Sequence, residues 1–149
     1  MKTIKAISIT ALLVIFGFQL SIADMSAQIT QIKSSQLPAL ARSTVSKTWN
    51  GAPIIDAWRN KEGRRIEYKA SVEDGSTMKF NANGQWIEVK SYGGVPGSLF
   101  PTALLSHLDK YFEGRYIVRA TKTTKRYQVE LNDGSKLEFN PKGVFQAFL

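Results

Sequence analysis

Apolar and polar residues alternate along much of the chain after residue 53, and a period of two is typical of half-buried β-strands. The clearest run spans 65–72, whose alternate positions are apolar: Ile66, Tyr68, Ala70 and Val72. The same pattern predicts three more strands, at 54–59, 76–81 and 85–89. Asp74-Gly75 and Asn83-Gly84 separate the later strands, and such pairs favour tight hairpin turns. The pattern therefore predicts four consecutive antiparallel strands.

A helical period precedes these strands. Apolar or weakly polar positions recur there at spacings of three and four, as on one face of a helix. They are Leu37, Leu40, Ala41, Thr44, Val45, Thr48 and Trp49. Ser35 is a candidate N-cap with Pro38 in the first turn, and Gly51 and Pro53 end the helix. We expect this helix to cover the apolar face of the sheet.

The whole pattern occurs twice in the chain. The segment 73–86 aligns without a gap on 132–145, and such self-similarity indicates a tandem repeat. We predict an α+β fold of two repeats, residues 35–90 and 98–149, each with one helix packed on a four-stranded antiparallel sheet. A linker rich in glycine and serine joins them at 91–97. The pattern leaves open whether the repeats continue one sheet or only share a core.

The first residues carry an export signal. Lys2 and Lys5 precede a mostly apolar run and small residues, which predicts a signal peptide at 1–23, with an alternative cut after residue 27. The run is too short for a spanning helix, and we expect no transmembrane segment after signal removal. Residues 24–34 are expected to form a tether. The chain of 149 residues has no cysteine, so it has neither disulfides nor a lipidated cysteine. We expect a periplasmic or secreted protein.

One motif is familiar. Residues 132–145 read N-D-G-S-x-L-x-F-N-x-x-G-x-F, and they follow a strand that begins at Tyr127. This motif, together with Val95-Pro96 before the second helix, resembles the PepSY-like family of small exported bacterial proteins. The resemblance covers about residues 35–149. It implies a β-lactamase-inhibitor-protein-like fold and a non-enzymatic binding or inhibitory module.

The sequence offers few residues that could act in catalysis. Nucleophilic catalysis needs an activated nucleophile and a base, but there is no cysteine, and the one histidine, His107, falls on the buried stripe of its helix. Asp74, Asn81 and Asn83 could offer oxygen ligands to a metal, but their positions match ordinary hairpin chemistry. We therefore expect no enzyme, no metal site and no cofactor.

The charge distribution is the best lead to function. The net charge is +8, and cleavage of the signal peptide removes two lysines, which leaves +6. Basic residues cluster in two hairpin regions, and Trp58 has no aromatic counterpart in the second repeat, which leaves it free for the surface. The candidate binding residues are Trp58, Arg59, Arg64, Arg65, Arg119, Lys122 and Arg126.

The expected partner is an acidic protein surface or an anionic envelope polymer, because a basic field steers acidic partners and an exported protein rarely meets nucleic acid. The first functional hypothesis is an exported, non-enzymatic binding module resembling a protein or peptidase inhibitor. The alternative hypothesis is a binder of anionic envelope polysaccharide or lipid headgroups through the basic hairpin loops. Steep salt dependence with little selectivity would mark the alternative.

Overall fold

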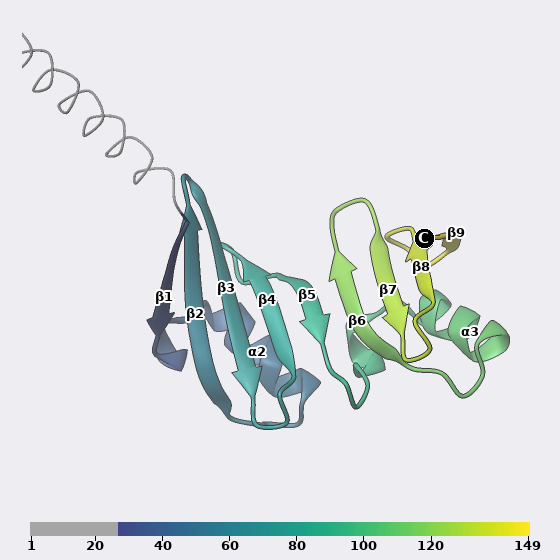
Figure 1. Ribbon diagram of the computed structural model, residues 1–149, viewed down its shortest axis with the longest axis horizontal. Coiled ribbons are helices and arrows are strands. Elements are labelled where there is room, and N and C mark those ends of the chain that lie inside the picture. The colour runs from purple at the N-terminus through teal and green to yellow at the C-terminus, as the bar shows by residue number, and fades with distance from the viewer. Residues whose placement is uncertain (1–26) are drawn as a thin grey trace, which may run out of the picture.

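The computed structural model describes residues 27–149 (Figure 1). The signal peptide expected at 1–23 lies outside this range. Within residues 27–149, nine strands are accompanied by two α-helices, α2 (Ala39–Thr48) and α3 (Thr102–Tyr111), and by two short 3-10 turns, η1 (Ser34–Gln36) and η2 (Gly97–Leu99). The strands are β1 (Gln28–Ile32), β2 (Ile54–Glu62), β3 (Arg65–Val72), β4 (Thr77–Asn81), β5 (Trp86–Lys90), β6 (Ile117–Lys122), β7 (Tyr127–Leu131), β8 (Lys136–Phe139) and β9 (Phe145–Phe148).

All nine strands form one antiparallel sheet in sequence order, and this overturns the predicted fold class. Two repeats with a four-stranded sheet each were expected. The structure instead pairs β5 with β6, through Val89 opposite Ala120 and Lys90 opposite Arg119. The prediction was wrong because it rested on side-chain patterns, whereas strand pairing across the segment between β5 and β6 is made by backbone groups.

The sheet also begins earlier than the sequence indicated. Residues 24–34 were expected to form a tether, but Gln28–Ile32 pairs antiparallel with β2 over its full length. Only the last of its residues is even partly buried, so no apolar alternation marks it as a strand. An edge strand with both faces near solvent gains its stability from backbone hydrogen bonds to one neighbour.

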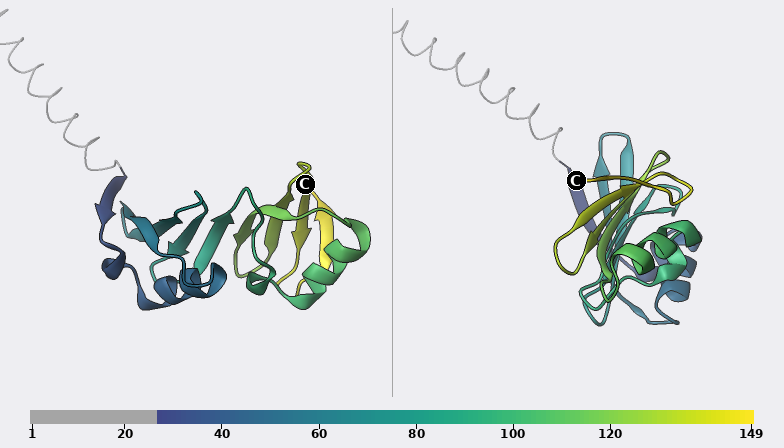
Figure 2. Two further views of the ribbon diagram at one scale, coloured as in Figure 1. Left: turned by 90° about the horizontal axis from the view of Figure 1, so that it is seen from below. Right: turned by 90° about the vertical axis from the view of Figure 1, so that its right-hand side faces the viewer.

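Both helices lie on the same side of the sheet (Figure 2). The core fills the space between them and the apolar face, where Val45 of α2 and Leu104 of α3 are buried with Phe80 and Phe139 of the sheet. Trp86 packs against Phe100 and Tyr127, with ring centroids 6.0 and 6.1 Å away. Because Trp86 lies on β5 and Tyr127 on β7, these aromatic contacts make the core continuous across the pairing of β5 with β6.

Two glycines bring the turns against the helices. Gly84 has φ +83°, and a Cβ there would lie 2.8 Å from Cβ of Pro38. Gly143 has φ +86°, and a Cβ there would lie 2.8 Å from the backbone nitrogen of Leu104. The turns before β5 and β9 thus need glycine both for the backbone angle and for the close approach.

Candidate binding site on the open sheet face

The face of the sheet opposite the helices is polar, and we call it the open face. Successive side chains of a strand point to opposite faces, so the residues that alternate with the core line it. One row crosses all nine strands in register: Gln31, Trp58, Lys69, Lys79, Glu88, Thr121, Gln128, Glu138 and Ala147. At about 4.8 Å between strands, this row is roughly 38 Å long. The open face is therefore an extended surface that offers charged groups and one large aromatic ring.

Trp58 lies at a hollow on this face. The hollow has a volume of about 330 Å³, and its lining includes Ile29, Asn60 and Lys79. The ammonium of Lys69 lies 5.5 Å from the centre of the Trp58 ring, at the distance of a cation–π contact. Oδ1 of Asn60 is buried and finds no hydrogen-bond partner within residues 27–149. The hollow thus combines an aromatic surface, two cations and a free acceptor.

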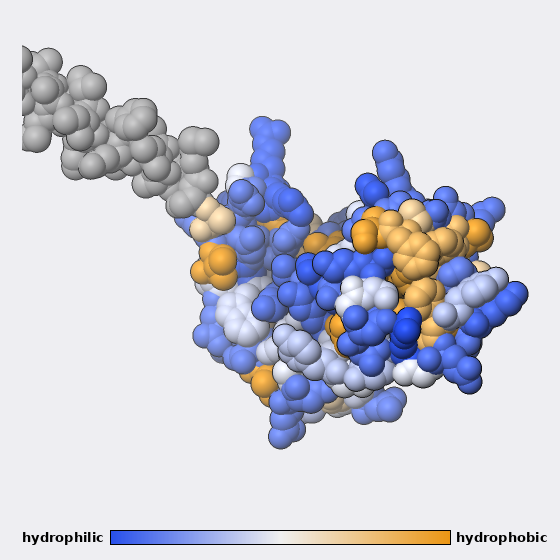
Figure 3. Space-filling view, turned by 45° about the vertical axis from the view of Figure 1, so that its right-hand side comes forward, coloured by the Kyte–Doolittle hydropathy of each residue, from blue (hydrophilic) through white to orange (hydrophobic). Residues whose placement is uncertain are grey.

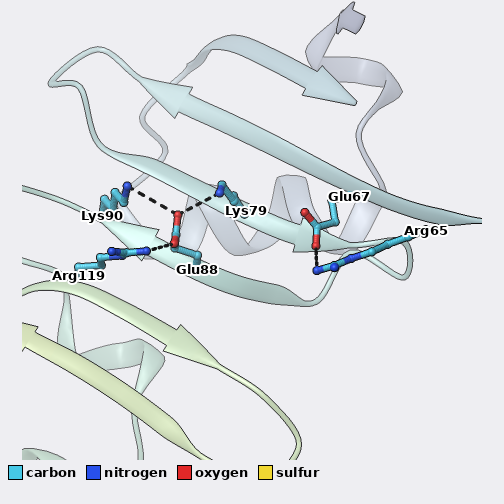
Figure 4. A network of polar contacts seen from close by, with 6 residues as sticks. All are labelled: Arg65, Glu67, Lys79, Glu88, Lys90 and Arg119. Atoms are coloured by element: carbon cyan, nitrogen blue, oxygen red, sulfur yellow. Dashed lines mark hydrogen bonds and ion pairs between the residues drawn. The ribbon is translucent and has the colours of Figure 1, made fainter. Parts of the chain in front are cut away.

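A carboxylate surrounded by cations lies beside the hollow (Figure 4). Glu88 on β5 is buried, and Arg119 on β6 approaches it at 2.7 Å, with Lys79 at 3.4 Å and Lys90 at 3.9 Å. Burial by itself would raise the pKa of Glu88, but the hydrogen bond from Arg119 and the charges of the three cations outweigh it and lower the pKa. Three cations around one carboxylate leave the centre of the open face positive.

The structure brings some of the predicted binding residues to the open face. Trp58 is part of the row described above, and Arg119 lies on the same face, two residues before Thr121 on β6. Arg65 also lies there and forms an ion pair with Glu67, which lines the hollow. Arg126 pairs with Glu138 at 3.0 Å, at the far side of the same face. Four of the seven predicted residues therefore share one face, although Arg126 and Trp58 lie on well-separated strands.

The other three lie elsewhere. Arg59 follows Trp58 on β2 and so points to the opposite face, in register with Tyr68. Arg64 lies in the turn between β2 and β3. Lys122 is on the helix side, where its ammonium lies 5.4 Å from the Trp86 ring. The predicted set thus does not form a single site.

Several residues of the hollow are absent from the candidate set, although the sequence already placed Lys69 in the basic cluster of the first hairpin. Lys69 and Lys79 sit beside Trp58 on the next two strands, and Asn60 lies two positions along β2. The signal was present, because residues two apart on a strand share a face and hairpin pairing sets their neighbours. The prediction instead grouped residues by closeness in sequence, which placed Arg59 beside Trp58.

The aspartates of the hairpin turns stabilise those turns by accepting backbone hydrogen bonds. Oδ1 of Asp74 accepts a 2.8 Å hydrogen bond from the backbone N–H of Ser76, and Oδ1 of Asp133 does the same with Ser135 at 3.0 Å. These backbone hydrogen bonds lower the pKa of both carboxyls. Within residues 27–149, no three His, Cys, Asp or Glu side chains are grouped to hold a metal ion.

His107 packs among aromatic rings, as its place on the helix stripe predicts. Its ring stacks on Phe145 at 4.7 Å with an interplanar angle of 11°, and Phe139 meets it edge-on at 5.5 Å. Trp86 is buried in the core. None of the helices in the described part of the chain has the length and apolarity to cross a membrane.

Comparison with known proteins shows the family. The family described as "Putative beta-lactamase-inhibitor-like, PepSY-like" matches residues 66–147, which is more than half of the chain. The chain therefore belongs to the PepSY-like family, as the turn motif at 132–145 predicted. A search of curated proteins gave no match. Neither the family nor the similar structures below indicate a class of enzyme.

Solved structures share the fold. A "putative calcium-regulated periplasmic protein" from Bacteroides thetaiotaomicron has a TM-score of 0.76 at 20% identity, over 81% of this chain and 96% of its own. A "putative periplasmic protein of unknown function" from Bacteroides vulgatus has a TM-score of 0.75 at 22% identity, over 83% of this chain and 99% of its own. A second periplasmic protein from Bacteroides vulgatus also scores 0.75, at 18% identity, over 82% and 97%. At these identities the likeness shows the fold.

Proposed function

We propose that this chain is a non-catalytic binding module, exported to the periplasm, that holds a protein partner on its open sheet face. One observation carries the proposal: Trp58 is only half-buried and lies over the hollow beside Lys69 and the unpartnered Asn60. The inhibitor-like description of the family supports a role in which binding inhibits the partner protein. The periplasmic description of the similar structures supports the location.

The physics of the open face fits a protein surface. Tryptophan is a frequent anchor in protein interfaces, since its large ring gains much from burial at little entropic cost. Lys69 and Lys79 would attract carboxylates of the partner. Together with the ring of Trp58, these cations favour an acidic partner surface.

A second candidate function rests on a different observation. The long hairpin of β2 and β3 carries Arg59, Lys61 and Arg64, all exposed and without an ion-pair partner within residues 27–149. Such a hairpin suits an anionic envelope polysaccharide or lipid headgroup. Binding of that kind depends on charge and falls steeply with salt.

The two functions are separated by affinity capture from envelope extract with the mature protein, at low and at high salt. If the open face holds a protein, one stoichiometric protein remains bound at high salt and is lost from Trp58→Ala. The matched control is Tyr92→Ala, since Tyr92 is exposed and lies in the turn after β5. Broad capture that disappears at high salt and in the double variant Lys61→Glu/Arg64→Glu would instead support the polymer or headgroup, and would refute the open-face proposal.

A further inference from the structure

The last strand of the sheet has an unused backbone edge. β9 pairs with β8 on one side, and no strand of the described chain pairs with its other side. The backbone N–H of Leu149 donates to the carbonyl of Lys136 at 3.0 Å, so Leu149 directs its backbone groups toward β8. Alternate residues of an antiparallel strand direct these groups to opposite sides, so Phe148 directs its N–H and carbonyl outward. The edge can therefore hydrogen-bond a further strand.

The side chains at this edge are apolar. Val144 is 52% exposed, Phe148 68% and Leu149 60%, and residues 144–149 carry no charged side chain. Natural edge strands are usually protected by charges or proline. Figure 3 shows an apolar patch over the side of the molecule where β9 lies, with hydrophilic residues around it. This edge lacks the usual protection against pairing.

The apolar patch packs on aromatic side chains of the core. Phe145 stacks on His107, and the rings of Phe145 and Phe148 lie 5.3 Å apart. The β8–β9 pairing shifts register between Glu138 and Phe139, so that Phe145 and Phe148 both point to the helix side with Phe139 and Leu137. Two aromatic rings therefore form a ready surface on one side of the edge.

β5 occupies the position in the first half of the sheet that β9 occupies in the second, and its outer edge is paired. It follows a turn like the one before β9, and its pairing with β4 shifts register at the corresponding place, between Lys79 and Phe80. The outer edge of β5 is occupied by β6, which runs antiparallel and places Ala120 opposite Val89. In β9 the corresponding edge is free among residues 27–149, so an extended antiparallel segment fits it.

The charges around the patch favour an acidic occupant. Lys110, Lys136 and Lys142 lie on α3, β8 and the turn before β9, and none of them has an ion-pair partner in the described part of the chain. Two nearby carboxylates are already paired, Asp133 with Arg115 and Glu138 with Arg126. Glu130 lies opposite Lys136 without an ion-pair partner within residues 27–149, so three lysines face one such carboxylate. A second copy of this chain would bring the same lysines to the interface, whereas an acidic segment would neutralise them.

We propose that β9 accepts an extended segment of a partner protein as a tenth strand. The segment alternates apolar side chains, which pack on Phe148 and Phe145, with acidic side chains, which face Lys136 on the open face. Backbone hydrogen bonds to the edge supply affinity, and the alternating side chains supply selectivity, as in other cases of strand addition. This surface is separate from the hollow at Trp58.

The test uses a labelled peptide, acetyl-Asp-Val-Glu-Val-Asp-Val-amide, and fluorescence anisotropy. Phe148→Asp is expected to weaken binding by about tenfold or more, since it removes the anchor and repels the acids. The matched control is Ile55→Asp, since Ile55 is 54% exposed on β2, far from β9 in the strand order and outside the lining of the hollow at Trp58. Ile55→Asp and Phe148→Tyr are both expected to bind as the unchanged chain does.

A peptide with proline in place of the central valine checks the backbone contribution, because proline removes a donor. Weaker binding of this peptide supports strand addition. Four results would overturn the proposal: no binding of the acidic peptide, equal binding of the proline peptide, an equal loss in Ile55→Asp, or a dimer of this chain that Phe148→Asp abolishes. The last result would mean that a second copy covers the edge.

Discussion

Arg119 on β6 donates a 2.7 Å hydrogen bond to the carboxylate of Glu88 on β5, at the place where the two strands pair. The sequence pattern left open whether the two expected repeats continue one sheet at this place. Glu88 also lies within ion-pair distance of Lys79 and Lys90, so the strands on both sides contribute to one charge cluster. The ion pair therefore stabilises the junction that makes the sheet continuous.

The first prediction concerns the strength of this ion pair. A double-mutant cycle of Glu88→Gln and Arg119→Met is expected to give a coupling free energy of about 1 kcal/mol in urea unfolding, since Glu88 is buried while Arg119 is half-exposed. The control cycle uses Arg126 and Glu138, a more exposed pair, and should give a smaller coupling free energy because solvent screens it. Equal coupling in both pairs would show that the junction has no special role.

The second prediction concerns pH. The pKa of Glu88 is lowered in the folded chain below its ordinary value of 4.5. The folded state then binds fewer protons than the unfolded state, so the stability that Glu88 contributes is fully present above that ordinary value. This stability is lost as the pH falls through the ordinary pKa and then through the lowered pKa of the folded state. Measured by thermal unfolding, the difference in stability between the unchanged chain and Glu88→Gln should narrow toward low pH. A stability difference that stays constant with pH would contradict this assignment.

The third prediction separates backbone strain from close approach. Gly143 and Gly134 have nearly the same φ, +86° and +87°, but only Gly143 lies against a helix. Gly134→Ala is expected to cost about 1 kcal/mol of unfolding free energy, from the backbone angle alone. Gly143→Ala should cost about 3 kcal/mol or more, because the new methyl group meets Leu104 and Pro101. Equal costs would mean that the turn does not pack on α3 as described.

The fourth prediction concerns cooperativity. Phe80 on β4 is fully buried, and Phe80→Ala should lower the unfolding free energy by about 3–5 kcal/mol. Since the sheet and its core are continuous, amides of Val129 on β7 and Leu137 on β8 should lose hydrogen-exchange protection along with those of β4. If protection at Val129 and Leu137 stayed unchanged, the parts of the sheet covered by α2 and α3 would unfold independently.

Much of the local structure was predictable from the sequence. The period of two in 65–72 predicted β3, and Asp74-Gly75 and Asn83-Gly84 mark turns in the structure. The helix stripe predicted α2, but the expected start was wrong: Pro38 occupies the N-cap position, and Ser35, the expected N-cap, lies in η1. These features depend on residues close in sequence, and side-chain chemistry specifies them directly.

The arrangement of the sheet was not predictable in the same way. Pairing of β5 with β6 joins backbone groups across a segment that contains η2 and α3, and no side-chain pattern marks it. β1 carries the sequence Gln-Ile-Thr-Gln-Ile, which is too polar and exposed to show a strand period. For the site, alternation along β2 already separated Trp58 from Arg59, but the neighbours of Trp58 depend on hairpin register.

The central claim is that the open face holds a protein partner around Trp58. The most direct measurement is photo-crosslinking in cells, with a photoreactive amino acid at Gln31, which is exposed and in register with Trp58. The comparison position is Leu40 on α2, which is exposed on the helix side. We predict that the label at Gln31 captures one protein, that the label at Leu40 does not, and that Trp58→Ala abolishes the product. Capture from Leu40 alone, or capture from Gln31 that persists in Trp58→Ala, would contradict the claim.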